Sequence, residues 1–271
     1  MPRALQVVHT FKQAITGGAF EALAAASGDA LAVPNFIQGS QAKILEVWAG
    51  NSANAGEFSI RSPSMHDNVR GIRMAAMFNP TLSGADGDPN LLFPLAFTQP
   101  LYPSDVLIVE VNATATNNVA LAMLQLFDDL PGADQYLISY GELLSRAVDN
   151  VGIRVSVTAG AAGDYGTGVA LNGTESRLKA NTDYAILGAT GQLPCCTLGF
   201  VAPETSGRKI AMPLSWNPLV SAGWFVDLSL KYDQALVPVV NSNNAGNVIF
   251  TAADPGGAIA TAATVLMAEL R

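Results

Sequence analysis

The sequence predicts an all-β protein with two tandem jelly-roll or β-sandwich domains, a helical linker between them and an N-terminal amphipathic helix. Short runs rich in Val, Ile, Leu and aromatic residues alternate with clusters of Asn, Gly, Pro and Ser, at a spacing of about ten residues. About seven or eight such runs in each half are typical of a sandwich or a jelly roll. A pattern in the first half also returns in the second, which indicates two copies of one domain.

A nine-residue pattern occurs twice in the chain. Residues 72–80 read IRMAAMFNP and residues 210–218 read IAMPLSWNP, so both fit I-x-M-x-x-x-[F/W]-N-P at an offset of 138 residues. Arg70 and Arg208 each lie two residues before the Ile. The Asn-Pro pair ends a strand and begins a turn, because proline has no backbone N–H to donate to a ladder.

Two further pairs of segments support the duplication. V-N-x5-N-V occurs at 111–119 and at 240–248, an offset of 129 that leaves nine extra residues in the first copy, which we assign to the turn-rich run 82–90. Residues 41–63 parallel residues 181–203, and both segments end in Pro. Solenoid repeats are much shorter than these offsets, so the pairs predict a duplicated globular domain.

These observations divide the 271 residues into four segments. The linker is expected to contain a helix over 139–150, where Ser139 and Glu142 have the spacing of a capping box. The four segments are an N-terminal helical arm at 1–29, a first jelly roll at 30–130, a helical linker at 131–151 and a second jelly roll at 152–271.

The N-terminal arm is expected to form an amphipathic helix, because apolar residues recur at helical spacing with basic residues beside them. Such a helix can lie on a membrane surface, against a neighbouring subunit or on its own domain. The apolar face would carry Leu5, Val8, Phe11 or Lys12, and Ile15, and the basic residues are Arg3, His9 and Lys12.

The charge composition excludes one class of partner. The net charge is −8, and an acidic surface repels phosphate, so we expect no direct binding of nucleic acid. Charged residues make up 13% of the chain, against about 25% in an average soluble domain. So low a value fits a surface covered by neighbouring subunits, or one on which Ala, Gly, Ser, Thr and Asn take the place of charges.

The sequence shows no sign of membrane insertion or secretion. Its apolar runs are shorter than the roughly 18 residues of a transmembrane helix, and its N-terminus lacks the apolar core of a signal peptide. The only cysteines are the neighbours Cys195 and Cys196, which would point to opposite faces of a strand and rarely bridge one another. We expect both thiols to stay reduced, as in a protein assembled in a reducing compartment.

Motifs for catalysis are sparse. The two histidines, His9 and His66, are too few for a metal-binding double cupin, and no Ser or Cys has a histidine in a recognisable nucleophile motif. Carboxylates could serve a glycosidase, but their spacing selects no pair. The Gly-rich run 160–168 does not open a helix, so it predicts an inter-strand loop and not a phosphate site. We therefore expect no enzymatic activity.

One loop offers a candidate metal site. Asp86, Asp88 and Asn90 have the D-x-D-x-N spacing of the first part of an EF-hand loop. The glycine and the glutamate that complete such a loop are absent, so the alternative is a polar loop tip without metal. Calcium at these three residues is the only cofactor that the sequence suggests.

The chain resembles the double jelly-roll major capsid proteins of tailless icosahedral viruses, many of which enclose an internal membrane. The resemblance covers about residues 30–271. It rests on two tandem β-domains joined by a helix, on the size of the chain, and on the duplications at 72–80 and 210–218 and at 107–119 and 236–248. In that family the two jelly rolls stand side by side, perpendicular to the shell, and three chains form a pseudo-hexagonal trimer of six barrels.

The resemblance implies a structural protein without enzymatic activity, found in the virion and made in the cytoplasm of the host. Its partners would be two further copies of itself, neighbouring capsomers, minor capsid proteins and an internal lipid membrane reached by the N-terminal helix. It would make no direct contact with the genome.

A carbohydrate-binding, lectin-like module of two tandem sandwiches is the alternative of a different class. Such modules present exposed aromatic rings to sugars. The candidates are Trp48, Trp216 and Trp224, although Trp216 matches Phe78 in the repeat and is expected in the core.

Overall fold

The computed structural model describes residues 3–35, 41–51, 56–76, 90–91, 98–113, 118–130, 132, 134–171, 177–193, 195–215 and 218–271. The strands of the first half are β1 (Arg3–Lys12), β2 (Glu21–Ala22), β3 (Ala24–Ala25), β4 (Gln41–Asn51), β5 (Gly56–Arg61), β6 (Ile72–Ala76), β7 (Asn90–Leu91), β8 (Gln99–Leu101), β9 (Ile108–Ala113) and β10 (Val119–Asp128). Those of the second half are β11 (Leu137–Ile138), β12 (Ala147–Thr158), β13 (Val169–Ala170), β14 (Asp183–Gly191), β15 (Cys195–Val201), β16 (Ile210–Leu214), β17 (Val237–Asn241), β18 (Ile249–Ala253) and β19 (Ala260–Leu270).

Helices are short and few in the described part of the chain. They are α1 (Tyr140–Arg146), α2 (Pro218–Ser221), α3 (Trp224–Tyr232), and the 3-10 turns η1 (Ala161–Gly163), η2 (Pro203–Thr205) and η3 (Ser242–Asn247). The predicted all-β fold class is therefore confirmed, and the strands form four antiparallel sheets.

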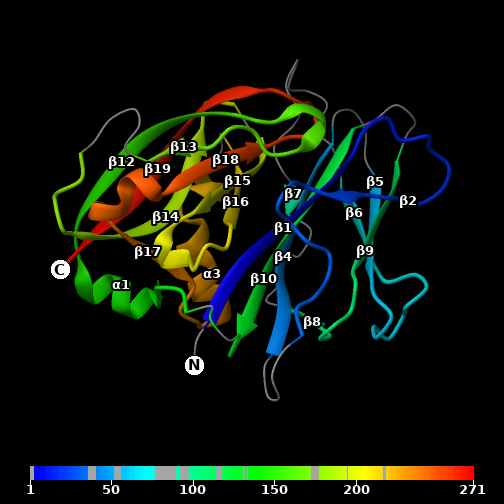
Figure 1. Cartoon of the computed structure of the whole chain (residues 1–271), viewed down its shortest axis with the longest axis horizontal. Coiled ribbons are helices and arrows are strands. Elements are labelled where there is room, and N and C mark those ends of the chain that lie inside the picture. The colour runs from blue at the N-terminus through cyan, green and yellow to red at the C-terminus, as the bar shows by residue number, and fades with distance from the viewer. Residues whose placement is uncertain are drawn as a thin grey trace.

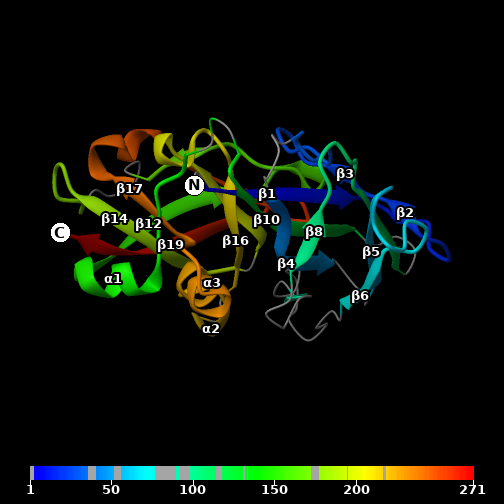
Figure 2. The same cartoon turned by 90° about the horizontal axis from the view of Figure 1, so that it is seen from below.

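Each half is a sandwich of two sheets, and the two halves have the same strand order. In the first half, β1-β10-β4-β8 form one layer, with β3 and β7 added, and β2-β9-β5-β6 form the other. In the second half, β12-β19-β14-β17 form one layer, with β11 added, and β13-β18-β15-β16 form the other. Eight strands in this order make a jelly roll, and the sandwiches lie side by side along the longest axis of the molecule (Figures 1 and 2).

The repeated nine-residue pattern marks equivalent strands. Ile72 begins β6 and pairs with Ile60 of β5, and Ile210 begins β16 and pairs with Phe200 of β15. Residues 41–63 and 181–203 are equivalent too, since they contain β4 and β5 in one copy and β14 and β15 in the other. These two pairs of segments confirm the duplication.

The third pair of segments was matched wrongly. Val111 and Asn112 lie in β9, whereas Val240 and Asn241 lie in β17, and these strands occupy different layers of the two sandwiches. The true counterpart of β9 is β18, and the offset between them is similar to the 138 residues of the first pattern. The supposed surplus of nine residues at 82–90 is therefore not needed to align the copies.

The prediction of an N-terminal helix is wrong, because residues 3–12 form the strand β1. Its ten residues pair with β10 along their whole length. Leu5 and Val7 face the second sandwich, and Ala4 and Val8 face the core of the first. A strand buried on both faces loses the alternation that identifies strands, and its apolar residues then match helical spacing by chance. These residues offer no helical arm to a membrane.

The linker helix is present but shorter than expected. The Oγ of Ser139 accepts a hydrogen bond from the backbone N–H of Glu142 at 3.2 Å, which confirms Ser139 as the N-cap. The Glu142 carboxylate pairs with Arg146, so only the Ser139 half of the predicted capping box is borne out. The helix ends at Arg146 and not at residue 150, because β12 begins at Ala147 and pairs with β19 back to Leu270. The ladder with β19 therefore overrides the helical pattern of these residues.

The layer of the first sandwich that contains β1, β10 and β4 is buried on both faces. It lies between the other layer of the first sandwich and the second sandwich (Figure 1). Alternate residues of β10 divide between two cores. Ala120, Ala122, Leu124 and Leu126 pack with the second sandwich, whereas Val119, Leu121, Met123 and Phe127 pack inside the first. We call the contact between this layer and the second sandwich the junction.

Candidate functional site: the junction between the sandwiches

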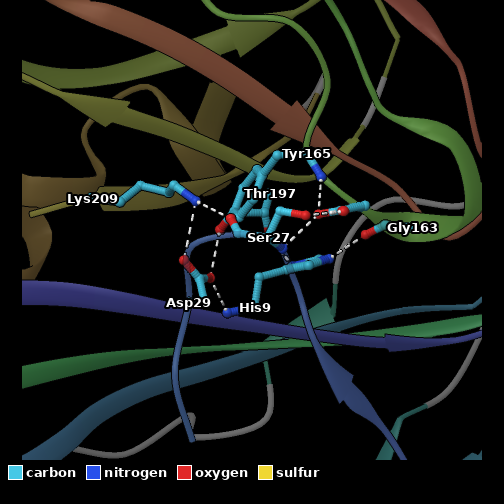
Figure 3. Close-up of polar contacts among 8 residues, drawn as sticks. His9, Ser27, Asp29, Gly163, Tyr165, Thr197 and Lys209 are labelled. Atoms are coloured by element: carbon cyan, nitrogen blue, oxygen red, sulfur yellow. Dashed lines mark hydrogen bonds and ion pairs between the residues drawn. The ribbon is translucent and has the colours of Figure 1, made fainter.

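A buried histidine lies in the junction, beside its apolar core. His9 points from β1 into the second sandwich, where its Nε2 is 2.9 Å from the carbonyl oxygen of Gly163 and its Nδ1 is 3.0 Å from Oγ1 of Thr197 (Figure 3). A carbonyl only accepts, so Nε2 carries the proton and Nδ1 accepts from the Thr197 hydroxyl. The same hydroxyl oxygen accepts from Nε1 of Trp48 at 3.2 Å. With a neutral ring, both ring nitrogens of His9 therefore have a hydrogen-bond partner.

Burial sets the charge of this histidine. Desolvation lowers the pKa of His9 from 6.5 to about 4, helped by the nearby charge of Lys209 and opposed by the bond to Gly163 and the charge of Asp164. His9 is therefore neutral at pH 7. A neutral imidazole in this setting positions its neighbours and holds the two sandwiches in register.

An ion pair crosses the junction beside His9. Nζ of Lys209 lies 3.0 Å from Oδ1 of Asp29, and the two side chains are 15% and 3% exposed. Oδ2 of Asp29 accepts the backbone N–H of His9 at 2.8 Å and the hydroxyl of Tyr165 at 3.1 Å. The Lys209 ammonium also lies 3.2 Å from the centroid of the Tyr165 ring. Each sandwich therefore supplies charged and polar partners to the other.

Desolvation also governs the titration of the acidic partners. It raises the pKa of Asp29, although Lys209 and the two hydrogen bonds oppose the shift. It raises the pKa of Tyr165 as well, and the charge of Asp29 adds to that effect. The Tyr165 hydroxyl therefore keeps its proton and donates a hydrogen bond, which the carboxylate of Asp29 accepts.

A second carboxylate joins the two halves at the same place. Asp164 accepts the backbone N–H and the hydroxyl of Ser27 at 2.8 and 2.5 Å. It also accepts the backbone N–H of Tyr165 at 2.7 Å, which fixes the loop that carries the ring. We call His9, Ser27, Asp29, Gly163, Asp164, Tyr165, Thr197 and Lys209 the junction network.

The junction is also closed at points away from this network. Gln135 donates to the carbonyls of Leu5 and Thr205 at 2.8 and 3.0 Å and accepts the N–H of Leu5 at 2.7 Å. On α3, Lys231 forms an ion pair with the buried Glu46 of β4. Polar contacts thus surround a junction whose centre is apolar.

Gly163 allows a close approach of the two sandwiches. Its φ is +90°, and a Cβ on it would lie 2.8 Å from the Cβ of Phe11 in β1. Non-bonded carbon atoms essentially never approach so closely, so only glycine fits without displacing β1. The Gly-rich run 160–168 is the predicted inter-strand loop, between β12 and β13, and it also packs against β1.

Gly163→Ala is expected to lower the free energy of unfolding by about 2 kcal/mol, since a left-handed backbone alone costs a residue with a Cβ about 1–2 kcal/mol. The matched control is Gly257→Ala, because Gly257 has φ +98° and open space around the new Cβ. Urea denaturation measures both losses. A loss in Gly163→Ala no larger than that in the control would contradict the packing role.

The residues predicted as sites fall into two groups. Asp86 and Asp88 lie outside the described residues, and Asn90 begins β7, so the calcium prediction stays a prediction. Within the described ranges no group of His, Cys, Asp and Glu residues is arranged to bind a metal ion.

Trp48 and Trp224 are buried against each other, with ring centroids 5.5 Å apart, and Trp216 lies outside the described residues. Two of the three tryptophans proposed to bind sugars are therefore in the core.

Sequence reasoning missed the junction network. The sequence pattern places His9 as a basic residue beside a helix, whereas its partners in the junction network lie 20 to 188 residues away in the chain. Only the unusual presence of a histidine between apolar residues of the same strand could have indicated a buried position.

Comparisons with known proteins give no family. No protein-family model matches the chain, and a search of curated proteins finds no match. The protein YhaK from Escherichia coli aligns over 97% of this chain and 86% of its own, with 8% identity and a TM-score of 0.23. The PBSX exported protein XepA aligns over 93% and 88%, with 13% identity and a TM-score of 0.19. The STIV MCP aligns over 99% and 97%, with 8% identity and a TM-score of 0.19.

TM-scores this low do not establish a shared fold, and we draw no function from these alignments. In the described part of the chain, the helices lack either the length or the apolar character that crossing a bilayer requires. The strand order and the junction define the chain as a protein of two tandem β-sandwiches joined by a buried interface.

Proposed function

We propose that the chain is a structural protein without enzymatic activity, the major capsid protein of an icosahedral virus, and that three copies form a pseudo-hexagonal capsomer. Its partners are two further copies of itself, neighbouring capsomers and minor capsid proteins. It is made in the cytoplasm of the host and functions in the virion, without direct contact with nucleic acid.

The observation that carries this proposal is the pairing of two sandwiches of identical strand order through a buried junction. A trimer of such chains contains six equivalent sandwiches, so a three-fold assembly can fill a six-fold position in a shell. The two sandwiches must keep a fixed spacing for this to work, because the tile has to match its neighbours on all sides.

The junction supports a fixed spacing. Separate domains usually move relative to one another unless their interface is large and hydrophobic. Here one apolar core extends from β1, β4 and β10 into the second sandwich, and the junction network adds hydrogen bonds and an ion pair around it. Such an interface favours a building block that acts as one unit.

Light scattering on a sizing column tests the proposal. We expect a particle of three times the 28.1 kDa chain mass, and negative-stain images of that particle should have a hexagonal outline. Larger closed shells at high protein concentration would also support it. A monomer at every concentration, together with specific binding on a glycan array, would contradict the proposal and favour the carbohydrate-binding alternative.

A further inference from the structure

A cleft of about 550 Å³ opens at the edge of the junction. One wall comes from β1 and the segment 27–34 of the first sandwich, and the other from the end of β15 and the segment 207–209 before β16. The volume lies in the range of about 300–1,000 Å³ that small-molecule sites occupy. Its polar lining residues are Gln6, Ser27, Asp29, Arg208 and Lys209.

Two of these lining charges balance each other. The carboxylate of Asp29 accepts hydrogen bonds from Lys209, from the backbone N–H of His9 and from Tyr165. Its negative charge is therefore already compensated within the protein. Lys209 in turn is held by Asp29 and by the ring of Tyr165. The pair belongs to the junction network.

Arg208 is the third charged residue that lines the cleft, and its contacts differ from those of Lys209. Its Nη1 donates to the neutral amide oxygen of Gln6, and its guanidinium carbon lies 5.9 Å from the centroid of the Phe127 ring. Among the described residues no carboxylate forms an ion pair with it, and it is only partly exposed. Burial lowers the pKa of Arg208, the direction expected for a cation removed from water, but a guanidinium stays protonated.

We propose that this cleft binds a small organic anion whose carboxylate or phosphate group is held by Arg208. The guanidinium has five N–H donors in a planar fork, which suits two oxygens of one anionic group. The described lining residues carry a formal charge of +1 in a chain of net charge −8, so the cleft is a local positive site. Val7, Ala30, Ala32, Pro34 and Val201 also line the cleft and favour a ligand with a short apolar part.

Calorimetric titration with butyrate and with inorganic phosphate tests this proposal and separates the two kinds of anion. We expect saturable binding of at least one probe to the wild type, and binding at least about tenfold weaker to Arg208→Gln, since a charge-assisted pair is lost. Arg154→Gln is the matched control, because Arg154 is an exposed residue of β12 away from the cleft. It should bind both probes as the wild type does.

Gln6→Glu provides a second variant that keeps Arg208 in place. A carboxylate at residue 6 would pair with Arg208 inside the protein, so we expect the variant to lose anion binding and to melt at a higher temperature. Equal binding by the wild type, Arg208→Gln and Gln6→Glu would overturn the proposal. So would the absence of saturation by either probe up to about 10 mM. The proposal does not rest on a capsid role, and neither outcome bears on the mass of the native particle.

Discussion

Trp48→Ala is expected to lower the free energy of unfolding by about 3–5 kcal/mol, the range for deleting a large aromatic side chain from a core. Trp48 belongs to β4 of the first sandwich but is fully buried against the second. Its ring meets Trp224 edge to face, and its Nε1 donates to the carbonyl oxygen of Cys196 at 2.7 Å. Equilibrium denaturation followed by circular dichroism measures the loss, since the method does not depend on the deleted fluorophore.

Trp48→Phe separates the packing of the ring from its hydrogen bond. It keeps most of the aromatic contact and removes the N–H, so we expect a smaller loss of about 1–3 kcal/mol. Phe58→Ala is a control inside the first core, because Phe58 is equally buried but packs within its own sandwich. Small-angle scattering under native conditions should show a larger maximum dimension for Trp48→Ala than for Phe58→Ala. Equal dimensions, or a stability loss below about 1 kcal/mol for Trp48→Ala, would contradict the role of Trp48 at the junction.

The sequence predicted the fold class because most strands keep a local signature. Runs of β-branched and aromatic residues end at turn residues, and this pattern needs no knowledge of distant contacts. The repeat was also visible, since Ile72 and Ile210 keep the same place in the sheet of each copy. Local propensity and internal repetition together were enough to predict two sandwiches.

The errors arose where tertiary contacts override local pattern. The strand β1 is buried on both faces, so its apolar residues no longer alternate and a helix was predicted. The start of β12 read as the end of a helix, and only its ladder with β19 makes it a strand. The V-N-x5-N-V match failed because a short polar pattern can recur in strands that are not equivalent.

The contacts of the junction network could not be predicted from the sequence. Its hydrogen bonds join residues such as Ser27 and Asp164, 137 positions apart, or Thr197 and His9, 188 apart. No local rule places such residues together, because their contact depends on how two finished sandwiches pack. Single histidines and aspartates in a β-rich sequence are usually solvated, so chemistry alone does not select them.

The stability of the protein is expected to fall by about 3 kcal/mol between pH 6.5 and pH 4 through His9 alone, from the pKa shift of that residue. Its pKa is lowered to about 4 in the folded state from an ordinary value of 6.5. Between these two values the unfolded chain binds the proton and the folded chain does not. Acid therefore favours unfolding in this window, and the full stability of the group is present above pH 6.5.

His9→Gln removes this titration and keeps the hydrogen bonds, because an amide can donate to Gly163 and accept from Thr197. Urea denaturation at a series of pH values should show a smaller fall in stability for His9→Gln than for the wild type. Asp29 accepts the backbone N–H of His9, and the charges of Asp164 and Lys209 act on the ring. These groups are present in both proteins, so the difference between the two curves isolates the histidine. His66→Gln is the matched substitution at an exposed histidine outside the junction network. Parallel curves for the wild type and His9→Gln would show that His9 takes up its proton without opening the junction.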